Sequence, residues 1–295
     1  MTIATIFKAS IATTLAALLL AGCGNESETT AALSETQLES SNHPSFRKVI
    51  DCLPDSAALM ASHRGTSRNW SVPENSLSGL NRLIVDGYKV AEIDVASTRD
   101  GVLFTFHDGV WEDMSTGKGA VARTKYAELE KILLKTRDGR LTSERPPLFT
   151  DMLALAKDRI YLEIDFKSSA KYESVLKAIR DADMADQVLL IAYSSGQAKK
   201  LSRLAPEMLL SVPPDSARPE NLVWFGTSAV DDPRVEDILN MGAGVIGRIW
   251  KNKDPRNFGA LLRNSKLVVT DYIDQYDPIM GLKDKAGYEA CLSAK

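Results

Sequence analysis

The sequence has little excess charge, no common phosphate-binding loop and no internal repeat. Its formal net charge is −3 over 295 residues, so it offers no basic field to a nucleic-acid backbone, and we expect no nucleic-acid partner. No Gly-x-Gly-x-x-Gly follows the first expected strand and no Walker-type loop is present, so neither common nucleotide-binding motif is indicated. Any phosphate must therefore be recognised by a few placed side chains.

The N-terminus differs in composition from the rest of the chain. Residues 1–8 carry one cation, residues 9–20 are apolar, and a polar tract follows. The apolar run is too short to span a bilayer, which predicts a signal peptide over residues 1–22. The four residues that end at Cys23, Leu-Ala-Gly-Cys, resemble the lipobox of bacterial lipoproteins, in which the cysteine is acylated. This resemblance implies a lipid-anchored envelope protein that faces the periplasm, in the outer membrane because Gly24 replaces Asp. The alternative is an ordinary secretory signal in which Cys23 has no special role.

A polar tether and one folded domain are expected after the signal. Residues 23–45 are rich in Ser, Thr, Glu and Asn and cannot support a packed core, so they predict a tether. The folded domain is expected over residues 46–295, with Cys52 near its start and Cys291 near its end. In an exported protein this pair could form a disulfide, since the chain ends of a closed barrel lie close together. Two unrelated thiols are the alternative.

The folded region alternates between short β-branched runs and helical patterns. This alternation over about 240 residues favours the α/β class, and the length suits a (β/α)8 TIM barrel with a small insertion after the second strand. A doubly wound open sheet remains an alternative on the pattern alone. Strands are expected at 58–62, 89–95, 102–106, 159–166, 187–192, 208–212, 243–249 and 266–270. Helices are expected at 75–85, 126–134, 169–182, 197–204 and 233–241.

Charged side chains stand two residues apart at the ends of two expected strands. Glu92 and Asp94 form one set, and Glu163, Asp165 and Lys167 form the other. Because side chains alternate along a strand, each set shares one face. At the C-terminal end of a barrel strand that face points into the mouth, where active sites are built. Carboxylates without cysteine favour a hard cation, Ca²⁺ or Mg²⁺, over Zn²⁺.

Two of the three histidines, His63 and His107, end expected strands beside these carboxylates. A pair of histidines can divide the acid and base roles near neutral pH. Arg64 offers a forked donor for phosphate oxygens and Lys167 a compact positive charge. Each feature alone is common in structural roles, but the combination indicates acid–base chemistry on a phosphate ester.

Several motifs, in this order and spacing, resemble the glycerophosphodiester phosphodiesterase family. The resemblance covers about residues 58–275 and is dense up to Lys167. The motifs are His-Arg-Gly at 63–65, Pro-Glu-Asn at 73–75, Glu-Ile-Asp-Val-x-x-Thr-x-Asp-Gly at 92–101 and His-Asp at 107–108. The similarity continues at 115–119, 145–148 and 268–271. One departure is the late strand at 245–250, which lacks the aromatic-Thr-Val-Asn stretch common in the family.

The resemblance implies one divalent cation with three carboxylate ligands. Glu92 and Asp94 match the metal-binding Glu-x-Asp of the family. Aligning Lys167 with the lysine of the family's Glu-x-Lys puts Asp165 at the third ligand position, and Glu163 remains a secondary candidate. The shorter aspartate side chain implies a shifted cation or an additional water.

The resemblance also implies roles for the remaining residues. His63 and His107 correspond to the acid–base pair, Arg64 and Lys167 to the phosphate-binding cations, and Glu74 to a supporting group. The implied reaction is hydrolysis of a small glycerophosphodiester to an alcohol and glycerol 3-phosphate. Two alternatives stay open, which are cleavage of lipid phosphodiesters in the manner of a lysophospholipase D or sphingomyelinase D, and a non-catalytic envelope-binding lipoprotein. The oligomeric state is not indicated.

Overall fold

The computed structural model describes residues 43–250, 255–276, 279–280, 282 and 284–294. The expected signal peptide at 1–22, the lipidation site Cys23 and the tether up to residue 42 lie outside the described residues. Within the described ranges, none of the helices combines the length and apolar character needed to cross a membrane.

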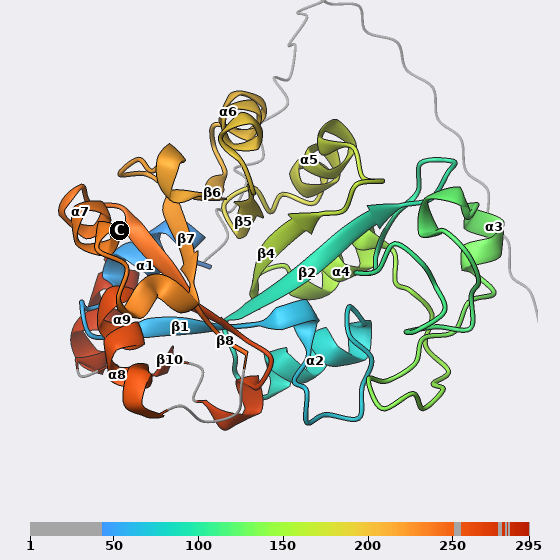
Figure 1. The fold of residues 1–295 in the computed structure, drawn as a ribbon, viewed down its shortest axis with the longest axis horizontal. Helices are drawn as coiled ribbons and strands as arrows, with labels where there is room; N and C mark the ends of the chain where they lie inside the picture. The colour runs from blue at the N-terminus through green and yellow to red at the C-terminus, as the bar shows by residue number, and fades with distance from the viewer. Residues whose placement is uncertain (1–42, 251–254, 277–278, 281, 283, 295) are drawn as a thin grey trace, which may run out of the picture. The chain divides into compact units, whose positions relative to one another are not determined.

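Eight parallel strands form a closed barrel, which confirms the expected TIM-type fold (Figure 1). The ring closes because β1 pairs with both β2 and the last barrel strand, β9. The barrel strands are β1 (Ala58–Ser62), β2 (Val90–Ser97), β4 (Tyr161–Phe166), β5 (Val188–Ile191), β6 (Leu209–Val212), β7 (Leu222–Gly226), β8 (Gly244–Ile249) and β9 (Leu267–Thr270).

Two of the described strands lie outside the barrel ring. β3 (Leu103–Thr105) pairs antiparallel with β2, and β10 (Ile279–Met280) pairs antiparallel with β1. The expected strand at 102–106 therefore exists, but it is not a barrel strand, because the tight turn after β2 can join only antiparallel neighbours. The barrel strand that was not expected is β7.

Most helices follow a strand and cover the outside of the barrel, whereas α1 precedes β1 and α3 lies in the insertion (Figure 1). They are α1 (Phe46–Cys52), α2 (Leu77–Val85), α3 (Tyr126–Leu129), α4 (Phe149–Ala156), α5 (Tyr172–Asp181), α6 (Ser195–Leu204), α7 (Arg234–Asn240), α8 (Pro255–Asn264) and α9 (Lys285–Ser293). Between β6 and β7, where every residue is described, a short 3-10 turn at Pro214–Ser216 replaces a helix. Consecutive prolines at 213 and 214 favour such a turn over a helix, because proline disfavours the helical conformation in the residue before it.

The insertion runs from residue 106 to residue 148 and lies on the right in Figure 1, beside the end of β2. It has a small apolar cluster of its own, in which Trp111 packs against Phe106 with ring centroids 4.5 Å apart. A helix was expected at 126–134, but only its first part, α3, is helical in the structure. The insertion is therefore a packed lobe that borders the barrel mouth.

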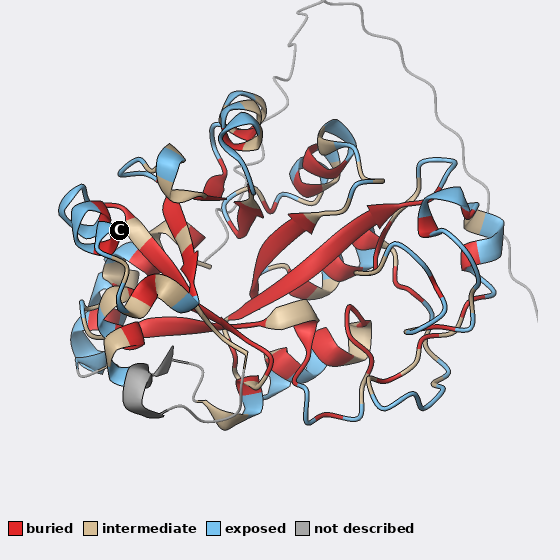
Figure 2. Ribbon diagram, viewed as in Figure 1, coloured by how far each residue is buried: buried red, intermediate tan, exposed pale blue. Residues whose placement is uncertain are grey.

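Buried residues are concentrated in the barrel strands and in the helix faces that meet them (Figure 2). Inward-facing apolar residues of the strands form one core with α1, which packs at the N-terminal end of the barrel. The Tyr161 ring stacks on Phe46 at 4.6 Å, and its hydroxyl donates to the carbonyl of Pro44 at 2.6 Å. Residues 43–45, expected in the tether, thus pack against the domain.

A disulfide joins α1 to α9 through Cys52 and Cys291. The two Cα atoms are 5.7 Å apart although 239 positions separate the residues in the sequence. Of the two outcomes left open by the sequence, the structure has the bonded one. The bond holds the first and last described helices together.

Candidate active site

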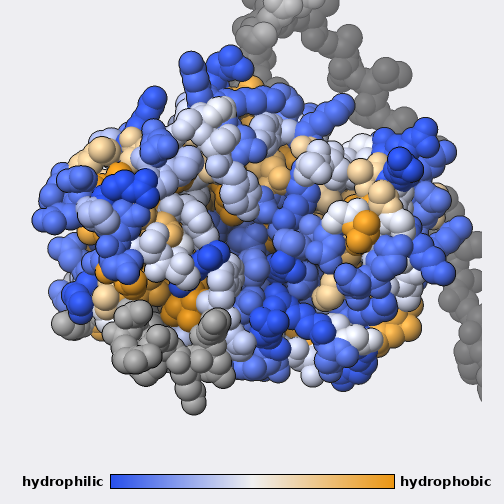
Figure 3. Space-filling view, viewed as in Figure 1, coloured by the Kyte–Doolittle hydropathy of each residue, from blue (hydrophilic) through white to orange (hydrophobic). Residues whose placement is uncertain are grey.

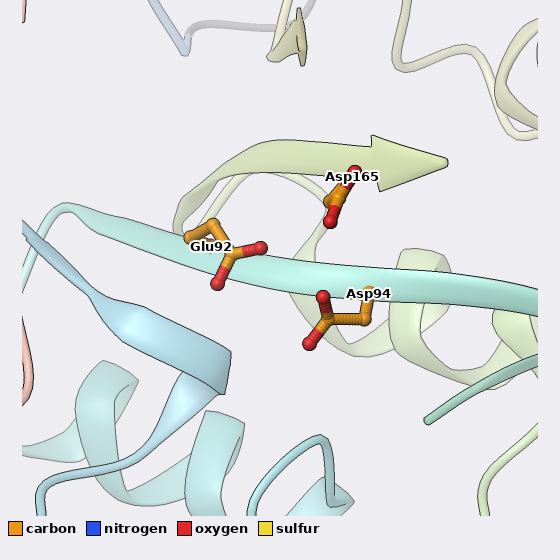
Figure 4. A group of neighbouring side chains, drawn as sticks. All are labelled: Glu92, Asp94 and Asp165. Atoms are coloured by element: carbon orange, nitrogen blue, oxygen red, sulfur yellow. The ribbon is translucent and has the colours of Figure 1, made fainter. Parts of the chain in front are cut away.

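Four carboxylates face the barrel interior from two neighbouring strands. β2 and β4 pair in parallel with Glu92 opposite Glu163 and Asp94 opposite Asp165. Carboxylate oxygens of Glu92, Asp94 and Asp165 lie within 4.8 Å of one another, and Figure 4 shows the three side chains pointing toward a common centre. The three expected ligands therefore meet in space, and this group does not include Glu163.

Burial shifts the pKa values of these four carboxyl groups. All four are at most 6% exposed, and loss of water disfavours the charged form of an acid. Burial and the charge of Asp94 raise the pKa of Glu92 well above its ordinary value, and burial also raises the pKa of Asp165. Burial acts in the same direction on Asp94, but Lys167, His107 and Asn75 together outweigh it and lower the pKa of Asp94. For Glu163, burial raises the pKa to about 8.

Lys167 is the counter-charge of the acidic group. Its Nζ lies 2.6 Å from Asp94 Oδ1 and 2.7 Å from Asp165 Oδ2. Asp165 Oδ1 and both carboxylate oxygens of Glu163 are buried, and among the described residues they have no hydrogen-bond partner. Buried carboxylate oxygens without partners are costly, and oxygen-only donors are what a hard cation prefers. The side chains present thus fit a divalent cation at this group.

The first histidine is bound to a carboxylate from the last barrel strand. His63 lies in the turn η1 (His63–Gly65) after β1, and its Nδ1 is 2.8 Å from Asp271 Oδ1. The same oxygen is 3.3 Å from Nη2 of Arg137. Burial opposes ionisation of Asp271, but the bonds from His63 and Arg137 prevail and lower its pKa. A carboxylate only accepts hydrogen bonds, so the ring proton is on Nδ1 and Nε2 is the atom left for chemistry.

The second histidine has the same pattern of contacts. His107 Nδ1 is 2.7 Å from Asp108 Oδ1, and its Nε2 is 2.9 Å from Nη2 of Arg64. A guanidinium only donates, so Nε2 accepts and the His107 ring is neutral in this arrangement. The bond from His107 lowers the pKa of Asp108.

Arg64 connects three of the expected site residues. Its Nη1 donates to Glu74 Oε1 at 2.8 Å, its Nη2 reaches His107, and its backbone N–H donates to Glu92 Oε2 at 2.7 Å. Its φ of 56° lies in the left-handed region, which costs a non-glycine residue on the order of 1 kcal/mol. Strain of this kind persists where the surrounding contacts require it, as the three contacts of Arg64 do here.

Four contributors were not among the predicted site residues: Asp271 and Asp108, which bind the histidines, and Asn75 and Arg137. Asn75 donates from Nδ2 to Asp94 Oδ2 at 2.7 Å and accepts from the Asp94 N–H at 2.9 Å, so it fixes the orientation of that carboxylate. Arg137, in the insertion, donates to Glu74 Oε2 at 3.1 Å as well as to Asp271. Asn75, Asp108 and Asp271 had a sequence signal, since they belong to segments that resemble the family, whereas Arg137 had none.

The structure brings all nine predicted site residues to the mouth of the barrel, in the strands or the turns that follow them. Arg64 joins Glu74, Glu92 and His107, while His63 is linked to this network through Asp271 and Arg137. Fold and site together define a TIM-type barrel protein with two carboxylate-paired histidines beside a candidate cation site.

Comparison with known proteins gives the family. The model of the glycerophosphoryl diester phosphodiesterase family matches residues 63–231, more than half of the chain. The chain belongs to this family. The matched range contains every predicted residue from His63 to Lys167, whereas Asp271 lies beyond it.

Individual relatives match about half of the chain. A glycerophosphodiester phosphodiesterase of Caldanaerobacter subterraneus is 27% identical over 52% of this chain and 65% of its own length. One of Bacillus altitudinis is 28% identical over 51% of this chain and 64% of its own length. The matches thus span slightly less than two thirds of these relatives.

Solved structures share the fold. A glycerophosphoryl diester phosphodiesterase of Parabacteroides distasonis superposes with a TM-score of 0.67 at 19% identity, covering 80% of this chain and 94% of that one. A phosphodiesterase of Oleispira antarctica, solved with the product sn-glycerol-3-phosphate, has a TM-score of 0.61 at 20% identity, covering 77% and 96%.

Proposed function

We propose that the protein hydrolyses small glycerophosphodiesters to an alcohol and glycerol 3-phosphate. The observation that carries this proposal is the pair of histidines, His63 and His107, each with Nδ1 bound to a carboxylate, in a network that Arg64 joins to the buried acidic group. Family membership supports the reaction type. The Oleispira antarctica structure with sn-glycerol-3-phosphate supports the product.

One divalent cation, Ca²⁺ or Mg²⁺, would be held by Glu92, Asp94 and Asp165. When bound, it would neutralise phosphate charge and stabilise the negative charge of the transition state. Arg64 and Lys167 would bind the remaining phosphate oxygens, which requires each of them to exchange a carboxylate or histidine partner for the substrate.

The two histidines would divide the proton transfers of a two-step displacement. In the first step the neighbouring hydroxyl of glycerol attacks phosphorus, which has a large effective-concentration advantage because the hydroxyl is already attached. His107, whose Nε2 is an acceptor, removes the proton from that hydroxyl. His63 acts as an imidazolium whose Nδ1 proton is held by Asp271, and it donates its Nε2 proton to the leaving alcohol. Water then opens the cyclic phosphate with the two roles reversed.

The test is release of glycerol 3-phosphate from glycerophosphocholine by the protein without residues 1–23. We expect activity to disappear with EDTA, to return with Ca²⁺ or Mg²⁺, and to be lost in His63→Ala. Turnover of a lysophospholipid instead of glycerophosphocholine would move the function to lipid head groups. Absence of turnover on both would contradict the enzymatic proposal.

We also propose that the protein is a lipoprotein anchored through Cys23 and facing the periplasm. The lipobox-like residues that end at Cys23 support this, and the polar stretch that follows is suited to a tether. Mass spectrometry of the mature N-terminal peptide should find an acylated Cys23. Cleavage at another position, with an unmodified thiol, would contradict the anchor.

A further inference from the structure

The two histidines of the site are held by different kinds of contact. Each ring has Nδ1 on a carboxylate. The second contact of His107 is a hydrogen bond at Nε2, which it shares with Arg64. Among the described residues, no hydrogen bond reaches Nε2 of His63. The second contact of His63 is the ring of Trp250, with ring centroids 4.5 Å apart and ring planes at 49° to each other.

The hydrogen bond to Asp271 alone leaves the ring of His63 incompletely restrained. The χ2 torsion of histidine has broad minima, so the preferences of the side chain itself do not fix the plane of the ring. The ring can pivot about its contact with Asp271, and this pivot moves Nε2, the atom that donates the proton in the proposed mechanism. A hydrogen bond at Nε2 would stop the motion but would occupy the reacting atom. An aromatic neighbour restrains the ring and leaves Nε2 free.

Trp250 is itself held from two directions. It follows β8 and packs against the apolar core inside the barrel. Arg248 stands two residues earlier, on the same face of the strand. Its guanidinium carbon lies 5.1 Å from the centroid of the Trp250 ring, which is within the range of a cation–π interaction. The Nε of Arg248 is buried and has no hydrogen-bond partner in the part of the chain that the structure describes.

The end of β7 provides the room that Arg248 occupies. β7 and β8 pair with Gly226 opposite Gly247. A Cβ at position 226 would lie 3.3 Å from Nε and 3.4 Å from Cδ of Arg248, so a larger residue would press on the arginine. Gly226 also has a φ of 60°, a conformation that glycine adopts without a steric cost. The glycine at the end of β7 therefore allows Arg248 to lie against the strand end and beside Trp250.

We propose that Trp250 is a positioning residue for His63 and that Arg248 holds Trp250 in place, an inference that rests on the proposed phosphodiesterase function. Trp250 keeps the imidazole in the orientation in which the Nε2 proton passes to the oxygen of the leaving alcohol as the bond from phosphorus to that oxygen breaks. Arg248 and Trp250 both lie in the segment 245–250, which departs from the stretch common in the family. The contact is therefore made outside the motifs that carry the resemblance.

The test compares two leaving groups. Choline needs a proton to leave, whereas 4-nitrophenolate, from the 4-nitrophenyl ester of glycerol 3-phosphate, is a weak base that leaves without one. Single-turnover release of the alcohol, with saturating Ca²⁺ or Mg²⁺, reports the first step alone. We expect Trp250→Leu to slow release of choline from glycerophosphocholine by about tenfold, because a misplaced acid loses part of its contribution. Release of 4-nitrophenolate from the activated analogue should slow by less than about twofold.

Three further variants grade the effect. Trp250→Phe retains an aromatic ring and should restore choline release to within about threefold of the wild-type rate. Arg248→Met should show the same leaving-group pattern as Trp250→Leu, with choline release about threefold slower than in the wild type. His63→Ala removes the acid altogether and should show the pattern at its full size of about 10²–10⁴-fold.

Trp70→Leu is the matched control. Trp70 also contacts an aromatic ring, that of Tyr88, and the guanidinium of Arg82, but it belongs to the core outside the barrel. This variant should leave both release rates unchanged. Thermal unfolding of each variant shows whether it is folded at the assay temperature. If Trp250→Leu does not fold, Arg248→Met carries the same comparison.

Three outcomes overturn the positioning role while the phosphodiesterase function stands. The first is equal slowing of both leaving groups in Trp250→Leu, which points to attack or phosphate binding. The second is unchanged release of choline in that variant. The third is a Trp250→Phe variant as slow as Trp250→Leu, since the aromatic ring is then not what the site needs. Absence of turnover of both esters by the wild type overturns the proposed function itself.

Discussion

The two sides of the barrel mouth differ in how their polar groups are satisfied. On the β1–β4 side, Arg64, Glu74, Asp94 and Lys167 each contact one or more charged or polar partners at 2.6–3.1 Å. On the β5–β7 side a small cavity has mainly apolar walls, which include Ile191, Pro213 and Trp224. The difference indicates that the charged and polar groups suited to phosphate chemistry are concentrated on the first side.

The hydropathy of the outer surface shows this difference between the two sides only in part. Hydrophilic side chains predominate on the face shown in Figure 3, and apolar ones occur there in separated groups. The two sides therefore differ in the contacts that side chains make inside the mouth rather than in the hydropathy of the outer surface. Variants on the first side should therefore change the rate on every substrate.

The largest effect is expected from His107→Ala. Removing an acid–base group lowers turnover by about 10²–10⁴-fold, and it should do so equally for glycerophosphocholine and glycerophosphoglycerol. Steady-state kinetics on both substrates tests this. Near-normal turnover of this variant, or slower turnover of only one of the two substrates, would contradict the assignment of the acid–base chemistry to the β1–β4 side.

A smaller effect is expected from Asn75→Gly. Glycine tolerates the φ of 52° at this position, so the substitution removes the two hydrogen bonds that orient Asp94 without adding backbone strain. Loss of a group that orients a metal ligand costs about 10–100-fold in cation affinity. A titration of activity against Ca²⁺ or Mg²⁺ measures it. The control is Asn69→Gly, an exposed residue in the same segment, which should leave the titration unchanged.

Arg137→Met should act through Asp271 and Glu74. Losing the two charge-assisted bonds is expected to lower kcat by about tenfold. Arg137 contributes to lowering the pKa of Asp271, so its removal raises that pKa. The protonated form then accumulates at higher pH, and the acid limb of the pH–rate profile should move upward. Arg123→Met, an exposed arginine of the same insertion, is the control. An acid limb that does not shift would contradict the proposed coupling between Arg137 and Asp271.

The smallest effect on activity is expected from the double variant Cys52→Ser with Cys291→Ser. The disulfide lies between α1 and α9 rather than at the mouth, so kcat at low temperature should be unchanged. Stability should fall by about 2–5 kcal/mol, as for removal of other native disulfides. Thermal unfolding measures this. A loss of activity before any loss of folded protein would show that the two ends of the barrel are coupled.

Short motifs made the β1–β4 side predictable from the sequence. His63, Arg64, Glu74, Glu92, Asp94 and His107 stand within 45 consecutive residues, in motifs with a fixed order. Alternation on one strand places Glu163, Asp165 and Lys167 on the same face, and the resemblance of Asp165-x-Lys167 to the family's Glu-x-Lys singles out Asp165 as the ligand. The partners that complete this side were harder to find, because Asp271 is 208 positions from His63 in the sequence and only the closed ring brings them together.

The β5–β7 side could not be predicted for a related reason. β7 is a run of five residues that begins directly after a charged segment, whereas β3 has an equally good strand pattern but pairs outside the ring. A local pattern predicts that a segment is extended, and it does not say which neighbour it will pair with. The cavity depends on four such strands converging, so no single stretch of sequence indicates it.

The chain enters the barrel at the end that α1 closes, where Pro44 meets Tyr161 at the start of β4. Because α9 is bonded to α1, the last described helix is also held there. The active-site mouth lies at the opposite end of the strands. A bead or a fusion partner joined directly to residue 43 would therefore be attached at the end of the barrel opposite the mouth.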